Sequence, residues 1–130
     1  MTKDEIIHNA ANAVKKYEKS VLFAYLFGST ARAENSLSGD IDIAVYLGGS
    51  TEAFFETKLA LYADLCRALK RNDVDLIILN TAANLILLED IIRTGLVLYD
   101  SAPDARENFE LGALHRSLDF KTQRLAVMGV

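Results

Sequence analysis

Several features are scarce or missing in this chain of 130 residues. It has one cysteine, Cys66, so no disulfide can form within the chain and the signature of an oxidising compartment is lacking. No apolar run approaches the roughly 18 residues that a membrane-spanning helix needs. The first residues also lack the apolar stretch of a secretory signal. We therefore expect a cytoplasmic protein that does not enter a membrane.

Clustered positive charge is missing as well. The 14 Lys and Arg residues stand against 18 Asp and Glu residues, which gives a net charge of -4. Gripping a long phosphate backbone requires clustered cations, so we do not expect nucleic acid as a direct partner. A small anionic ligand is compatible with this charge, because a bound metal ion can supply the positive charge.

The length and the apolar pattern indicate a single domain over residues 1–130. Apolar periodicity predicts helices over 3–19, 52–70, 82–93 and 104–125, a short helix over 29–34, and strands over 21–27, 40–47, 74–79 and 96–100. A short turn-like segment, 34–39, precedes the second strand, whereas helices connect the later strands. We expect an α/β (α+β) fold with a small mixed β-sheet and helices packed mainly on one side.

Two of the predicted helices carry apolar stripes. In the helix over 52–70 the stripe consists of Phe55, Leu59, Tyr62, Leu65, Cys66 and Leu69, a spacing typical of a helix that packs on a core. In the last helix, Phe109, Leu114 and Leu118 are expected to close the core. Its distal part, 120–127, mixes basic and apolar residues, and it is compatible with a partner groove or a dimer contact.

The clearest chemical feature is a pair of aspartates, Asp40 and Asp42, in the strand over 40–47. Alternation directs both carboxylates to one face, while the intervening isoleucines point to the core. Like charges this close raise each other's pKa unless a cation lies between them. Magnesium prefers carboxylate and phosphate oxygens, and two such ions can clamp an in-line displacement. The pair therefore indicates a magnesium site, although a solvated strand face has the same pattern.

A second feature, Gly28-Ser29, directly follows the strand over 21–27. Glycine lets a phosphate approach the backbone closely, exposed N–H groups at a helix start favour anions, and the Ser29 hydroxyl can donate to a phosphate oxygen. Gly-Ser is a common turn dipeptide, but here ten residues separate it from Asp40. If the two strands pair, the segment between them brings Ser29 near the carboxylates.

Three more residues are candidates for the same site. Asp75 interrupts the apolar run over 74–79, and a buried unpaired carboxylate is costly, so we expect a third metal ligand or a general base for an incoming hydroxyl. The Arg32 fork suits phosphate oxygens, with a surface ion pair to Glu34 as the alternative. Tyr46 shares the face of the aspartates, where it either touches a nucleotide base or covers the sheet edge.

The string FGSTARAENSLSGDIDIAVYL, residues 27–47, resembles the nucleotidyltransferase motif GS-x10-DxD. With the later VDLIIL, the chain resembles, over most of its length, the minimal nucleotidyltransferase (MNT) family of the DNA polymerase β-like superfamily. The resemblance implies the polymerase β-like nucleotidyltransferase fold and a triphosphate contact at Ser29. It also implies magnesium, with two ions expected, held by Asp40, Asp42 and Asp75, and ATP bound at Gly28, Ser29 and Arg32. Many members have a serine where this chain has Gly39.

Small proteins of the family are commonly antitoxins that are paired with a HEPN-domain ribonuclease toxin. Some transfer AMP from ATP to a tyrosine of that toxin, and the resemblance implies this activity here. One alternative is an antitoxin that only binds, covering the toxin's RNA site with an acidic face. Another is a small-molecule nucleotidyltransferase, whose site a dimer would have to complete. A homodimer or a hetero-oligomer with the toxin is compatible with these functions.

Overall fold

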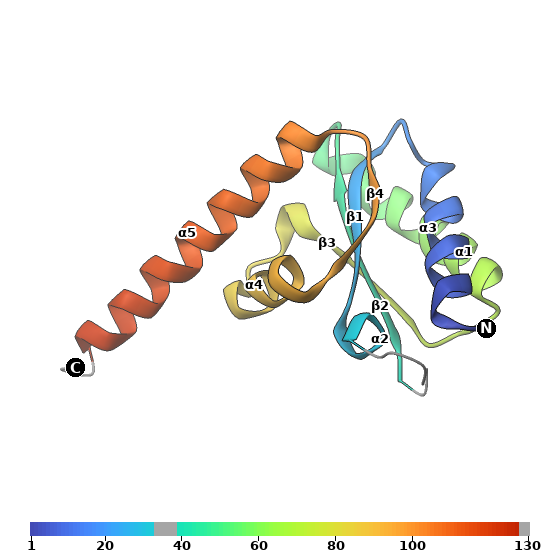
Figure 1. Cartoon of the computed structure of the whole chain (residues 1–130). Coiled ribbons are helices and arrows are strands. Elements are labelled where there is room, and N and C mark those ends of the chain that lie inside the picture. Colours follow the sequence, from blue (N-terminus) through green and yellow to red (C-terminus); the bar gives the residue numbers. More distant parts are fainter. Residues whose placement is uncertain (33–38, 128–130) are drawn as a thin grey trace.

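The structure, a computed structural model, describes residues 1–32 and 39–127. Helices and strands alternate along the chain (Figure 1). The α-helices are α1 (Lys3–Lys15), α2 (Gly28–Arg32), α3 (Phe54–Leu69), α4 (Leu85–Thr94) and α5 (Pro103–Val127); the strands are β1 (Val21–Phe27), β2 (Ile41–Leu47), β3 (Val74–Ile78) and β4 (Leu96–Asp100). The predicted order of elements is confirmed. Residues 34–38 of the predicted turn lie outside the described part of the chain.

The four strands form one mixed sheet in the order β3-β2-β1-β4. β1 pairs antiparallel with β2 and β4, whereas β2 pairs parallel with β3. Phe27 at the end of β1 lies opposite Asp42 of β2, and Asp42 lies opposite Asp75 of β3. One end of the sheet therefore gathers the end of β1 and the starts of β2 and β3.

The mixed sheet is confirmed, but helices cover both of its faces rather than mainly one (Figure 1). α1 and α3 form a core on one face with Ile41, Ile43 and Val45 of β2. α4 and the first half of α5 form a second core on the other face with Phe23, Tyr25 and Phe27 of β1. The second layer is needed because β1 is apolar on both faces, and its aromatic face cannot be left in water.

The part of α3 that faces the core differs from the predicted stripe. Phe54, Leu61, Leu65 and Leu69 are buried. Leu65 and Leu69 belong to the predicted stripe, but Phe55 and Leu59 are 67% and 53% exposed and Tyr62 is 37% exposed. α3 thus carries two apolar stripes, and periodicity alone cannot tell which of them packs on the sheet.

α5 runs outward from the rest of the molecule (Figure 1). Its first half packs as predicted, with the ring of Phe109 centred 5.7 Å from that of Phe23. Leu118, which was expected to close the core, is instead 64% exposed. Ser117 faces the body and donates a hydrogen bond to Glu89 of α4 at 2.5 Å. None of the helices in the described residues combines the length and apolarity that a bilayer crossing requires.

An ionic network fastens the start of α5 to the sheet. Arg106 Nε donates to Asp100 Oδ2 at 2.7 Å, and Arg106 also pairs with Glu110 at 3.2 Å. Glu110 accepts a 2.6 Å hydrogen bond from the Tyr25 hydroxyl of β1. Burial, followed by the hydrogen bond to Glu110, raises the pKa of Tyr25, so this hydroxyl keeps its proton and remains a donor.

We expect Arg106→Met to lower the free energy of unfolding by about 1–3 kcal/mol, because two partly buried carboxylates lose their cation. Urea unfolding measures the loss. The control is Arg67→Met, since Arg67 also pairs with an aspartate, Asp64, but its side chain is 72% exposed. An exposed ion pair contributes at most about 1 kcal/mol. Equal losses in the two variants would contradict a structural role for the network.

Candidate functional site

The turn after β1 brings the backbone directly against Asp42. Gly28 has φ of +76°, and a Cβ at this residue would lie 2.2 Å from Asp42 Oδ2. The left-handed region favours glycine, and here glycine is also the residue that leaves room for the carboxylate. The antiparallel pairing of Phe27 with Asp42 creates this approach. The structure thus brings Gly28 and Asp42 together.

A buried threonine fastens α2 over the start of β2. Thr30 is 2% exposed, and its Oγ1 donates to the backbone carbonyl of Asp40 at 3.1 Å. Beside it, the Ser29 hydroxyl lies over Gly39, where a Cβ would be 2.7 Å from Ser29 Oγ. Glycine at residue 39 therefore leaves room for the Ser29 hydroxyl next to Asp40.

Arg71, which precedes β3, also contacts the segment that leads into β2. It donates to the carbonyl of Gly39 at 2.7 Å, and its guanidinium pairs with Asp73. The backbone N–H of Ile41 donates to the carbonyl of Asp73 at 3.0 Å. Thr30 and Arg71 are not among the site residues predicted from the sequence. Their partners are backbone carbonyls, of Asp40 for Thr30 and of Gly39 for Arg71, and no residue pattern marks such contacts.

The negative charges of Asp40 and Asp75 act on Asp42. Asp42 is half-buried, whereas Asp40 and Asp75 are exposed. Burial raises the pKa of Asp42, the negative charges of Asp75 and Asp40 raise it further, and Arg32 opposes them. The ionised form of Asp42 is therefore unfavourable in the folded chain. A cation placed among these carboxylates would relieve the repulsion.

The residues fit a magnesium ion that arrives with a phosphate ligand. In the part of the chain that the structure describes, no three His, Cys, Asp or Glu side chains are gathered closely enough to hold a metal by themselves. Magnesium, however, usually keeps several waters and binds one or two carboxylates together with substrate phosphates. Asp40 and Asp42 would be those carboxylates, with Asp75 beside them. The raised pKa of Asp42 and the close packing of its carboxylate against Gly28 are both consistent with this arrangement.

Arg32 bridges α2 and α4. Its NH1 lies 3.5 Å from Asp90 Oδ2, and the two side chains are 54% and 43% exposed. The alternative partner Glu34 lies outside the described residues. Because an exposed ion pair contributes little, the guanidinium can leave Asp90 for a phosphate group.

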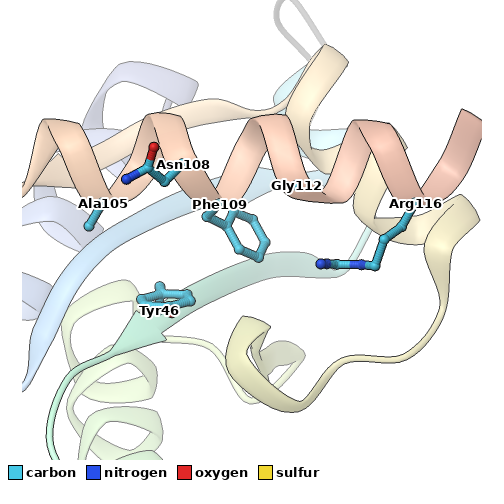
Figure 2. A pocket seen from close by; sticks show the side chains of 6 residues that line it. All are labelled: Tyr46, Ala105, Asn108, Phe109, Gly112 and Arg116. Atoms are coloured by element: carbon cyan, nitrogen blue, oxygen red, sulfur yellow. The ribbon is translucent and has the colours of Figure 1, made fainter.

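A cavity of about 410 Å³ lies at the other end of β2 (Figure 2). Its lining consists of Tyr46, Ala105, Asn108, Phe109, Gly112 and Arg116, and it includes none of the three aspartates. Tyr46 stacks on Phe23 with ring centroids 4.8 Å apart. Since β2 is an inner strand, Tyr46 does not cover a sheet edge, and that expectation was wrong. Contact between Tyr46 and a nucleotide base stays a prediction.

Residues 8–104 match the family model described as Polymerase beta, Nucleotidyltransferase. The chain belongs to this nucleotidyltransferase family. The match includes Gly28, Ser29 and all three aspartates of the site. Among curated protein sequences, none matches the chain.

Solved structures of toxin–antitoxin pairs share the fold of this nucleotidyltransferase chain. A mutant MntA-HpeT pair has a TM-score of 0.73 and 22% identity, covering 99% of this chain and 97% of that chain. The structure of a tri-AMPylated Shewanella oneidensis HEPN toxin in complex with its MNT antitoxin has a TM-score of 0.72 and 22% identity. The match covers 98% of this chain and 96% of that chain. A toxin–antitoxin structure with AMP-PNP has a TM-score of 0.70 and 25% identity, and the match covers 92% of this chain and 95% of that chain. The polymerase β-like fold therefore extends over nearly the whole chain.

Asp42→Asn should raise the melting temperature of the metal-free nucleotidyltransferase at pH 7. The folded state raises the pKa of Asp42 above its ordinary value of 3.8, so the ionised carboxylate costs stability once the pH exceeds that value. The advantage of the variant should vanish below pH 3.8, where the carboxyl is protonated in both states. Added magnesium should stabilise the wild type and the exposed control Asp119→Asn, but not Asp42→Asn. An equal magnesium response would contradict a metal site at Asp42.

Gly28→Ala should weaken nucleotide binding, because its Cβ would displace the Asp42 carboxylate. Gly49→Ala is a matched control: Gly49 also has a positive φ, +83°, but nothing lies within 4 Å of its Cβ position. The left-handed conformation costs each alanine about 1–2 kcal/mol, which urea unfolding would measure. Titration with Mg-AMP-PNP should show reduced affinity for Gly28→Ala alone. Equal affinities would show that the approach of Gly28 to Asp42 does not matter for binding.

Proposed function

We propose that this chain is a cytoplasmic antitoxin that transfers AMP from Mg-ATP to a tyrosine hydroxyl of a HEPN ribonuclease toxin. The observation that carries the proposal is the close approach of Gly28 to Asp42, in a chain of the nucleotidyltransferase family. The biological setting comes from similar structures, which include an MNT antitoxin with a tri-AMPylated HEPN toxin and a toxin–antitoxin pair with AMP-PNP.

The triphosphate would lie along the turn that begins at Gly28. The missing Cβ of Gly28 lets the Asp42 carboxylate lie directly against this turn. The Ser29 hydroxyl donates to a phosphate oxygen, and Arg32 exchanges Asp90 for the phosphates, where its planar fork forms charge-assisted hydrogen bonds. Thr30 and Arg71 act as positioning residues, since both bind backbone carbonyls of the segment that leads into β2.

Asp40 and Asp42 would hold magnesium, with two ions expected, and Asp75 would complete the site or act as the base. Bound magnesium neutralises phosphate charge and stabilises in-line displacement. The tyrosine oxygen attacks the α-phosphorus of ATP, the bond from that phosphorus to the bridging oxygen breaks, and pyrophosphate leaves. Asp75 accepts the proton of the hydroxyl. Asp75 is exposed on edge strand β3 and lies opposite Asp42, so it is open to an incoming protein.

Labelled ATP, magnesium and the cognate toxin test the proposal. The wild type should label a toxin tyrosine, and Asp42→Ala should lower the rate at least about 100-fold, because several kcal/mol of transition-state stabilisation depend on metal binding. Asp119→Ala, on the exposed surface of α5, serves as the control. If Asp42→Ala still protects cells as well as the wild type does, AMP transfer is not how the toxin is neutralised.

A second candidate is neutralisation by binding alone. The net charge of -4 and the exposed Asp40 and Asp75 give the chain an acidic face that is complementary to a basic RNA site. In this case, alanine at the aspartates would weaken association with the toxin, and ATP would have no effect. The labelling experiment and an affinity measurement without ATP distinguish the two functions.

A further inference from the structure

The cavity between β2 and α5 lies apart from the residues proposed to bind magnesium and the triphosphate. Its volume is about 410 Å³, and its lining contains none of those residues. Sites for small ligands have volumes of about 300–1,000 Å³ and combine aromatic walls with a few polar groups. The lining has this composition, because Tyr46 and Phe109 lie beside Asn108 and Arg116 (Figure 2). The cavity is therefore a candidate for a second ligand site.

Two aromatic rings form the apolar wall of the cavity. The ring centroids of Tyr46 and Phe109 lie 5.4 Å apart, with an interplanar angle of 57°. Phe23 holds Tyr46 in place, since the two rings stack with centroids 4.8 Å apart. Rings that neighbours already hold lose little further side-chain entropy when a ligand packs on them. This wall is suited to a flat aromatic ring.

Arg116 supplies the positive charge. Its guanidinium reaches back along α5 toward the Phe109 ring (Figure 2). The other cations of α5 have partners, which are Asp100 and Glu110 for Arg106, Glu89 for Lys121, and the ring of Phe120 for Arg124. Among the described residues, Arg116 has no hydrogen bond or ion pair. It is also the only charged side chain in the described lining, so the cavity favours a ligand with one anionic group.

Gly112 lies inside the long helix α5 and lines the same cavity. Glycine is less favourable than alanine in a helix, because it loses more backbone freedom on folding. Packing within the described residues does not require it. A Cβ at residue 112 would meet within 4 Å only the end of the Arg116 side chain, with NH1 at 3.6 Å. A glycine that packing does not require indicates that a group from outside the chain comes close to α5 here.

We propose that this cavity binds a nucleoside monophosphate such as AMP, without a metal ion. The base packs on the wall of Tyr46 and Phe109, and its phosphate accepts charge-assisted hydrogen bonds from Arg116. The amide of Asn108 can donate to and accept from the base or the ribose. A single cation suits one phosphate group better than a triphosphate. The site is additional to the proposed function and does not rest on it, because its lining contains none of the aspartates.

Isothermal titration with AMP in the presence of EDTA tests the site, with adenosine as the ligand that lacks the phosphate. The wild type should bind AMP about tenfold or more tightly than adenosine, since adenosine leaves Arg116 without an anion. Arg116→Gln should weaken AMP binding about tenfold or more and change adenosine binding less than about twofold. Arg124→Gln is the matched control, because Arg124 is also on α5 but contacts the ring of Phe120.

Two further variants separate this cavity from the triphosphate turn and from a folding defect. Arg32→Gln changes the turn and should leave the AMP affinity within about twofold of wild type. Gly112→Leu puts a side chain on the cavity side of α5 and should reduce AMP affinity about tenfold or more. Its urea midpoint should not fall below that of the wild type, because leucine favours a helix more than glycine does.

The outcomes that would overturn the site are distinct. One is a wild type that does not bind AMP or binds adenosine equally well. Another is an unchanged AMP affinity in Arg116→Gln or Gly112→Leu. A larger loss of AMP affinity in Arg32→Gln than in Arg116→Gln also overturns the site, because AMP would then bind at the turn after β1. AMP transfer to a toxin is measured separately and is not decided by any of these results.

Discussion

The pairing of Phe27 with Asp42 across β1 and β2 determines the arrangement of the whole site. The chain leaves β1 at the point where the Asp42 carboxylate emerges, and a Cβ on the next residue would overlap that carboxylate. Glycine at residue 28 avoids this overlap, and α2 begins there. Thr30 of α2 donates a hydrogen bond to the carbonyl of Asp40, which holds the helix against the start of β2. A single register of two strands thereby sets the positions of the glycine turn, the serine hydroxyl and the aspartates.

The ionised carboxylate of Asp42 lowers the stability of the fold. Asp42 is half-buried among like charges, and its raised pKa reflects that unfavourable environment. Two apolar cores, one on each face of the sheet, offset the cost and keep β2 in place. Bound magnesium and phosphate ligands would remove the repulsion, so their binding free energy would depend on the charges of the aspartates.

Exposed apolar groups are distributed unevenly around this framework. α3 packs one stripe on the sheet and leaves Phe55 and Leu59 exposed to solvent. The cavity lined by Tyr46 and α5 lies at the end of β2 that is remote from the aspartates, so this cavity and the candidate site occupy different parts of the molecule.

The order of the elements and most of the candidate site could be predicted from sequence, because both depend on local patterns. Alternation along β2 places Asp40 and Asp42 on one face, and the short segment after Gly28-Ser29 favours pairing of β1 with β2. Contacts between distant segments could not be read in this way. Only the tertiary structure decided which stripe of α3 is buried, that helices cover both faces, and that Arg71 binds the carbonyl of Gly39. Periodicity describes one element at a time, whereas packing depends on which neighbours the other elements supply.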